Sequence, residues 1–124
     1  MLEPGGSPPV LLLVDDETRI LSALHRTLRR EGYEILSAES AAEALRILAS
    51  RKVDLVLTDQ KMPGMSGLEL LEQVATRHPG VARLLITGWP EEIPREEIAR
   101  LGIRALIPKP WDDGELKTLL RDNS

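Results

Sequence analysis

Three short apolar runs in this chain each end on a charged group. They are Val10–Val14 before Asp15 and Asp16, 55–58 before Asp59, and 105–108 before Lys109. Runs this short and this apolar are typical of strands that are buried on both faces, as in parallel sheets. The carboxyl ends of parallel strands meet at one edge, so three carboxylates and an ammonium are expected to converge there. Such a crevice suits Mg²⁺ and a phosphoryl group.

Between these runs the apolar residues recur with the period of a helix. Strands are expected at 10–14, 33–37, 53–58, 82–86 and 104–108. Helices are expected at 17–30, 40–48, 66–77 and 94–101, and from 112 onward. Two of these helices open with a Ser-x-x-Glu capping box, at Ser40 and at Ser66.

Five strands that alternate with five helices predict an α/β fold, a doubly wound parallel sheet covered on both faces. We expect the strand order 2-1-3-4-5. Pro108 supports this order, because it lacks a backbone donor and is tolerated best in an edge strand. In such sheets ligands bind beyond the carboxyl ends at the switch point, here between the first and third strands. Asp15, Asp16 and Asp59 all fall at that point.

Composition limits the chain to one domain and excludes several classes of protein. A chain of 124 residues with 42% hydrophobic residues can bury a single core. An aromatic content of 2% and a net charge of −4 argue against nucleic acid as a direct partner. Cysteine is absent, which excludes thiolate chemistry and Cys-bound zinc. No apolar run approaches the ~20 residues of a membrane span, so we expect a cytoplasmic protein without membrane contact.

Each charged group has an ordinary explanation when taken alone. An Asp between a strand and a helix is usually a cap or a turn residue, and Asp59 opens a loop where Asx-turns are common. Taken together, however, three carboxylates at adjacent strand ends repel one another, by about 4 kcal/mol for a pair ~4 Å apart at an effective dielectric of 20. A cation that offsets this repulsion, with hard oxygen ligands, is expected to be Mg²⁺. Thr87 and Gly88, after the fourth strand, would add a hydroxyl and an unhindered N–H to the same rim.

Four motifs in this order resemble the receiver domain of two-component response regulators. They are Leu13-Val14-Asp15-Asp16-Glu17, Asp59 with Met62-Pro63-Gly64-Met65-Ser66-Gly67, Thr87-Gly88, and Lys109-Pro110-Trp111. The resemblance covers the chain from about Pro9 to Arg121. It implies a flavodoxin-like (βα)5 receiver fold, with a single receiver domain at 9–122, a disordered tail at 1–8 and no effector domain in this chain.

The resemblance also implies a role for each site residue. Asp59 would accept a phosphoryl group from a phosphohistidine on a sensor histidine kinase or phosphotransfer protein. Asp16 and Asp59 would bind Mg²⁺ directly, Asp15 mainly through water, and Lys61 through its backbone carbonyl. Thr87, the Gly88 amide and Lys109 would bind the phosphoryl oxygens. A cis Lys109–Pro110 peptide is expected as well. Phosphoryl transfer needs chiefly positioning and charge neutralisation, which these groups supply.

Two features depart from the usual receiver pattern. The position three residues before Lys109 is usually Tyr or Phe, the ring that turns inward on phosphorylation, and here it is Leu106. Lys61 and Trp89, each two residues beyond a site residue, stand beside the route by which water would reach the phosphoryl group. The readout of phosphorylation is expected on the surface of 94–101, 104–108 and the last helix, which would also serve a homodimer.

Two other functions fit the same fold. The first alternative is an interaction module that keeps the receiver fold without being phosphorylated, and Leu106 is the best argument for it. The second is a flavin carrier, which the scarcity of aromatic residues disfavours. Beyond its own phosphorylation and dephosphorylation the chain is not expected to be an enzyme. Its output would lie in an effector domain outside this chain or in a downstream target protein.

Overall fold

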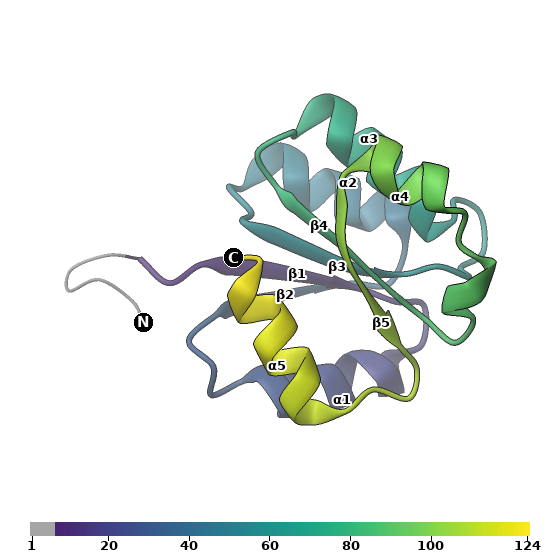
Figure 1. The fold of residues 1–124 in the computed structure, drawn as a ribbon. Coiled ribbons are helices and arrows are strands. Elements are labelled where there is room, and N and C mark those ends of the chain that lie inside the picture. Colours follow the sequence, from purple (N-terminus) through teal and green to yellow (C-terminus); the bar gives the residue numbers. More distant parts are fainter. Residues whose placement is uncertain (1–6) are drawn as a thin grey trace.

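The strands form one parallel sheet in the order β2-β1-β3-β4-β5, which confirms the predicted order (Figure 1). The computed structural model describes residues 7–124, so most of the tail expected at 1–8 lies outside the described residues. The strands are β1 Val10–Val14, β2 Glu34–Ala38, β3 Leu55–Asp59, β4 Ala82–Thr87 and β5 Ile103–Pro108. Pro108 is the last residue of an edge strand, where its missing N–H costs no central ladder bond.

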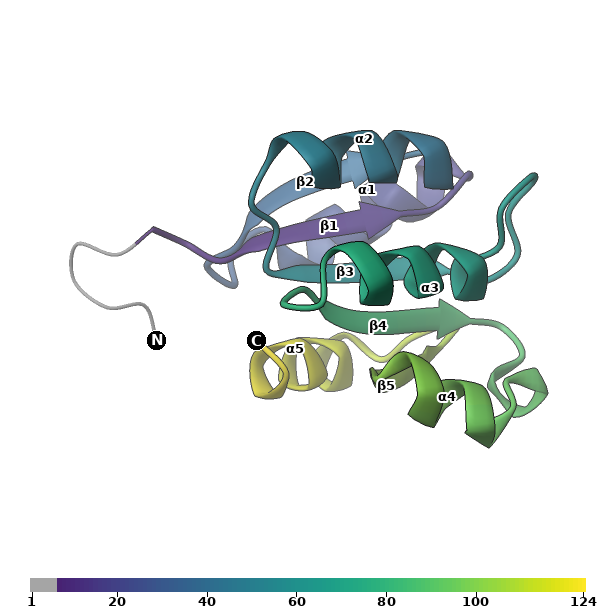
Figure 2. The ribbon, with the colours of Figure 1, turned by 90° about the horizontal axis from the view of Figure 1, so that it is seen from above.

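Helices cover both faces of the sheet. They are α1 Thr18–Leu28, α2 Ala41–Ser50, α3 Gly67–Arg77, α4 Arg95–Leu101 and α5 Asp113–Asp122. Figure 2 shows α2, α3 and α4 on one face, with α1 and α5 on the other. A short 3₁₀ helix, η1 at Pro90–Glu92, precedes α4 and was not predicted. No helix within residues 7–124 is long and apolar enough to cross a membrane.

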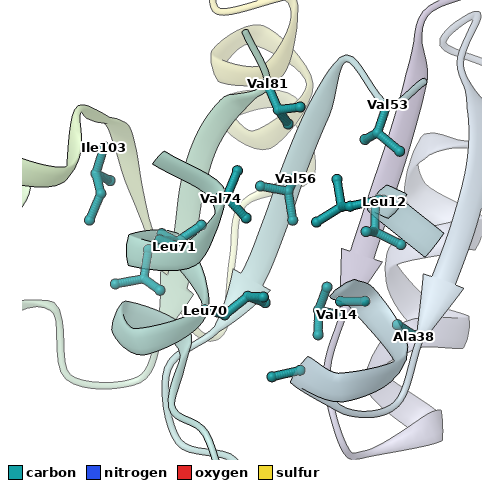
Figure 3. Packing of buried hydrophobic residues seen from close by; sticks show 14 of the residues in the cluster. Leu12, Val14, Ala38, Val53, Val56, Leu70, Leu71, Val74, Val81 and Ile103 are labelled. Carbon is teal, nitrogen blue, oxygen red and sulfur yellow. The ribbon is translucent and has the colours of Figure 1, made fainter. Parts of the chain in front are cut away.

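Successive residues of each central strand supply two separate aliphatic cores. Leu12, Val14 and Val56 pack with Leu70 and Val74 in the core beneath α2, α3 and α4 (Figure 3). The intervening leucines of β1 and β3 pack on the opposite face against α1 and α5. Full burial of one such side chain stabilises a fold by about 1.5–3 kcal/mol. This two-sided burial explains why β1 and the first three residues of β3 are consecutive aliphatic residues rather than alternating with polar ones.

Of the two predicted capping boxes, only the one at Ser66 forms completely. The Ser66 hydroxyl accepts a hydrogen bond from the Glu69 N–H at 3.2 Å, and Glu69 Oε1 accepts one from the Ser66 N–H at 2.9 Å. Ser40 also caps its helix by accepting from the Glu43 N–H at 3.1 Å. The Glu43 carboxylate, however, accepts from the N–H of Glu39 rather than from that of Ser40. The second prediction is therefore correct for the cap and wrong for the reciprocal bond.

Three strands, β2, β3 and β4, end one residue later than predicted, and the extra residues of β3 and β4 are candidate site residues. Asp59 continues the ladder of β3 opposite Ile86, and Thr87 continues β4 opposite Pro108. Their backbones are consequently held by the sheet rather than by a loop.

Gly67, the first residue of α3, lies directly against the end of β3. Its N–H donates to the Gln60 carbonyl at 2.9 Å, and a Cβ there would overlap the Asp59 carbonyl oxygen and approach Leu85 Cδ1 to 2.9 Å. We expect Gly67→Ala to lower the free energy of unfolding by about 1–3 kcal/mol, as overpacking does. Urea denaturation measures this change. Gly80→Ala is the control, because a Cβ at Gly80 meets nothing within 4 Å, and equal losses in both variants would contradict the contact.

Candidate functional site

The structure brings the three predicted acids together at the carboxyl edge of the sheet. Asp15 and Asp16 follow β1, and Asp59 ends the neighbouring strand β3. Carboxylate oxygens from all three lie within 4.8 Å of one another. The arrangement follows from the parallel pairing of β1 with β3, in which Val14 lies opposite Thr58.

The adjacent residues Asp15 and Asp16 have different surroundings. Asp15 is fully buried, and its Oδ1 accepts a hydrogen bond from the Glu17 N–H at 2.9 Å. Asp16 is exposed. Neither is the N-cap of α1, since that position is Glu17 and makes no side-chain cap bond. The ordinary explanation of this pair as a helix cap is therefore wrong.

Lys109 supplies the positive charge between the buried carboxylates. Its Nζ lies 2.8 Å from Asp15 Oδ2 and 3.0 Å from Asp59 Oδ1. The backbone N–H of Lys109 donates to the Thr87 carbonyl. The Lys109–Pro110 peptide bond is cis, as expected. Burial lowers the pKa of Lys109, but hydrogen bonds and attraction from Asp15 and Asp59 outweigh it, so the pKa lies above its ordinary value. Lys109 is therefore an ammonium at neutral pH.

Asp59 is a nearly buried carboxylate whose charge is incompletely compensated. Only 7% of the residue is exposed. Burial raises the pKa of Asp59, and the nearby charge of Asp15 raises it further, against opposing hydrogen bonds from Lys109 and Gln60. Because the net pKa is raised, the ionised form destabilises the fold at neutral pH, and an added cation would relieve that cost.

Thr87 and Gly88 stand on the same rim as Asp59. They help to line an open hollow of about 390 Å³ together with Glu17, Asp59, Lys61, Trp89 and Lys109. Thr87 is 1% exposed and its Oγ1 accepts a hydrogen bond from the Trp89 N–H at 3.1 Å. A Cβ at Gly88 would meet nothing within 4 Å, so its backbone faces open space. The hollow is large enough for a phosphoryl group.

Glu17 and Leu106 differ from their expected relation to the site. Glu17 lines the hollow and was not singled out as a site residue, although it continues the acidic run after Asp15 and Asp16. Leu106 does not line it, and packs instead against the core beneath α2, α3 and α4. Leu106 is therefore half-buried at the edge of this core.

Comparison with known proteins identifies the family. The chain matches the model of the response regulator receiver domain over residues 11–121. The hydrogenase transcriptional regulatory protein HoxA of Cupriavidus necator is 41% identical over 105 residues, which cover 82% of this chain and 21% of HoxA. The chain thus spans about a fifth of the length of that relative.

Two further comparisons cover nearly all of both molecules. Sporulation initiation phosphotransferase F of Bacillus subtilis is 31% identical over 111 residues, 90% of each protein. The crystal structure of response regulator protein TrrA from Thermotoga maritima has a TM-score of 0.84 and 32% identity, and the match covers 94% of this chain and 99% of TrrA. The chain belongs to the response regulator receiver domain family.

The incomplete compensation of Asp59 predicts that neutralising it stabilises the protein. In the absence of divalent cations at pH 7, we expect Asp59→Asn to raise the melting temperature by a few degrees, or ~3–6 °C if the gain is about 1 kcal/mol. Because the folded-state pKa is raised, this advantage is present above that pKa and disappears as acid protonates Asp59. Thermal melts of both proteins from pH 7 down to pH 4 measure it.

Asp16→Asn is the matched control for this experiment, since it removes the same charge from the same cluster at an exposed position. We expect Asp16→Asn to raise the melting temperature by less than Asp59→Asn does, because the exposed Asp16 carboxylate carries little desolvation cost. An unchanged or lower melting temperature for Asp59→Asn would mean that the carboxylates are not crowded.

Proposed function

We propose that this receiver domain accepts a phosphoryl group on Asp59, in a Mg²⁺-dependent reaction, from a sensor histidine kinase or a phosphotransfer protein. The observation that carries the proposal is the setting of Asp59, a nearly buried carboxylate at the base of an open hollow with an ammonium 3.0 Å away. A nucleophile in such a place is reached by a small group yet shielded from bulk water.

The transfer is a substitution at phosphorus. A carboxylate oxygen of Asp59 attacks, the bond from phosphorus to the donor histidine nitrogen breaks, and that nitrogen keeps the electron pair. Lys109 neutralises charge on one phosphoryl oxygen, and the Thr87 hydroxyl and Gly88 N–H donate to another. Because Lys109 already bridges Asp15 and Asp59, its ammonium is in place before the donor arrives. Little other chemistry is required of the protein.

The acidic cluster fits Mg²⁺ as the partner of this reaction. The ligands would be Asp16 and Asp59 directly, Asp15 mainly through water, and the backbone carbonyl of Lys61. These are hard oxygen donors, and their proximity within 4.8 Å suits one small divalent ion. The bound ion would supply charge neutralisation. Support also comes from TrrA, whose structure is described as a complex with Mg(2+)-BeF.

The consequence of phosphorylation is a shift between two conformations of the domain. Thr87 and Lys109 adjoin α4, β5 and α5, and this surface would transmit the change and serve a homodimer. HoxA is a transcriptional regulatory protein, which supports an output through an effector domain outside this chain or a downstream target. A cytoplasmic location and a single domain at 9–122 fit this function. The domain would catalyse only its own phosphorylation and dephosphorylation.

One observation favours a second function. Leu106 is half-buried against the core and occupies the position of the usual switch aromatic, so the fold is compatible with an interaction module that is never phosphorylated. Phosphorylation chemistry itself distinguishes the two functions.

We expect incubation with Mg²⁺ and acetyl phosphate to add the mass of one phosphoryl group to the intact protein. Acetyl phosphate serves as a small donor whose leaving group is acetate. The gain should disappear when the metal is chelated, and it should be absent in Asp59→Asn. Intact-protein mass spectrometry measures each of these results.

Asp54→Asn is the matched control, because Asp54 lies just before the amino end of the same strand, where its Oδ2 accepts a hydrogen bond from the Val10 N–H at 2.7 Å. This variant should be phosphorylated like the unmodified protein. No mass gain, or a gain that survives in Asp59→Asn, would favour the interaction module over the phosphorylated receiver.

A further inference from the structure

Two loops that contribute to the lining of the hollow are joined by side-chain contacts. Lys61 comes from the β3–α3 loop, and Trp89 and Glu92 come from the segment between β4 and α4. Lys61 Nζ lies 3.9 Å from the centroid of the Trp89 ring and 3.7 Å from Glu92 Oε1. We call these three residues the clasp. It joins loops from neighbouring strands, and two of its residues, Lys61 and Trp89, line the hollow that Asp59 also lines.

The clasp is connected to the phosphoryl site on its inner side. The backbone N–H of Trp89 donates to Oγ1 of Thr87, the same oxygen that would turn toward a phosphoryl group. Lys61, Trp89 and Thr87 line one hollow with Asp59. An anion bound to Asp59 would therefore act on Trp89 through two contacts, one to its ring and one to its backbone.

The exposure of its side chains makes the clasp easy to open. The side chains of Lys61 and Glu92 are 57% and 55% exposed, and Trp89 is 48% exposed. Cation–π and ion-pair contacts in water are weak, and a more strongly negative neighbour competes for the same ammonium. A phosphoryl group on Asp59 would be such a neighbour, because it adds negative charge inside the hollow that Lys61 lines.

The helix that follows the clasp is fastened at its far end. Arg100 in α4 pairs with Glu72 in α3 at 3.1 Å. Arg83 in β4 donates from Nε to the Leu101 carbonyl at 2.7 Å. These contacts join the carboxyl end of α4 to α3 and β4. A change that begins at Thr87 and Lys61 therefore reaches the segment 88–94 before it reaches α4.

From these contacts we infer that phosphorylation of Asp59 opens the clasp and that Trp89 is the side chain that reports the switch in this domain. Lys61 leaves the ring for the phosphoryl oxygens, Thr87 releases the Trp89 N–H, and segment 88–94 swings outward. The inference rests on the proposed phosphorylation of Asp59. It also supplies a readout that requires no aromatic ring at Leu106.

Acrylamide quenching of Trp89 fluorescence tests the clasp. Trp111→Phe leaves Trp89 as the single tryptophan, and each sample is divided between fluorescence and intact mass. We expect Mg²⁺ with acetyl phosphate to raise the quenching constant in proportion to the phosphorylated fraction. Since the residue is already 48% exposed, the rise should reach about twofold at most. Mg²⁺ alone, and Asp59→Asn with both reagents, should leave the constant unchanged.

Variants of Lys61 distinguish loss of the Lys61–Trp89 contact from a general loosening of the segment 88–94. Lys61→Met should raise the quenching constant before phosphorylation and abolish most of the further rise. Lys61→Arg keeps a cation over the ring and should behave like Lys61. If Trp111→Phe does not fold, the ¹⁹F resonance of 5-fluorotryptophan at Trp89, assigned with Trp89→Phe, reports the same change in the unsubstituted chain.

The outcomes distinguish the inference from the function on which it rests. No mass gain overturns both. A mass gain without a change at Trp89 overturns the clasp and leaves the phosphorylated receiver standing. The clasp is also overturned, and the phosphorylated receiver left standing, if the quenching constant of Lys61→Met equals that of the unmodified protein before and after phosphorylation. A mass gain with a change at Trp89 that depends on a cation at residue 61 supports the clasp.

Discussion

The ion pairs that Lys109 makes with Asp15 and Asp59 are the interaction on which the arrangement of the site depends. Asp15 is fully buried, and a buried carboxylate without a partner costs several kcal/mol. Lys109 compensates it at 2.8 Å while reaching Asp59 at 3.0 Å, and so ties together the ends of β1, β3 and β5. One ammonium cannot fully neutralise two carboxylates, with Asp16 also close by. The remaining negative charge is what makes this edge of the sheet a candidate for a divalent cation.

Much of the fold could be predicted from the sequence because its short continuous apolar runs are clearly distinct from the segments in which apolar residues recur with the period of a helix. Runs such as Val10–Val14 are too short for buried helices, and both of their faces are covered in the structure. The strand order was harder to predict, and a single residue, Pro108, pointed to an edge. The 3₁₀ helix at Pro90–Glu92 was missed because three residues are too few to show a period. Glu43 was misplaced as a reciprocal cap because its carboxylate accepts instead from the N–H of Glu39, one residue before the N-cap.

Within the site, the sequence predicted which residues meet but not how each of them is bonded. Asp15 and Asp16 are chemically identical neighbours, and only the turn after β1 decides that one is buried and the other exposed. The contact between Lys61 and Trp89 joins two loops, and no local pattern specifies where a long side chain in one loop meets a ring in another. Sequence reasoning therefore placed both residues beside the hollow without linking them.

Burial also determines which of the two lysines at the hollow is fixed and which is free to move. Lys109 is 20% exposed and holds a buried carboxylate, so its departure would leave Asp15 uncompensated. Lys61 is 57% exposed, and both of its partners can be replaced by water at little cost. A phosphoryl group on Asp59, as proposed, would thus meet one ammonium that is already in position and a second that can be drawn in from the rim. The first would suit transfer of the phosphoryl group, and the second would suit a signal that the transfer has occurred.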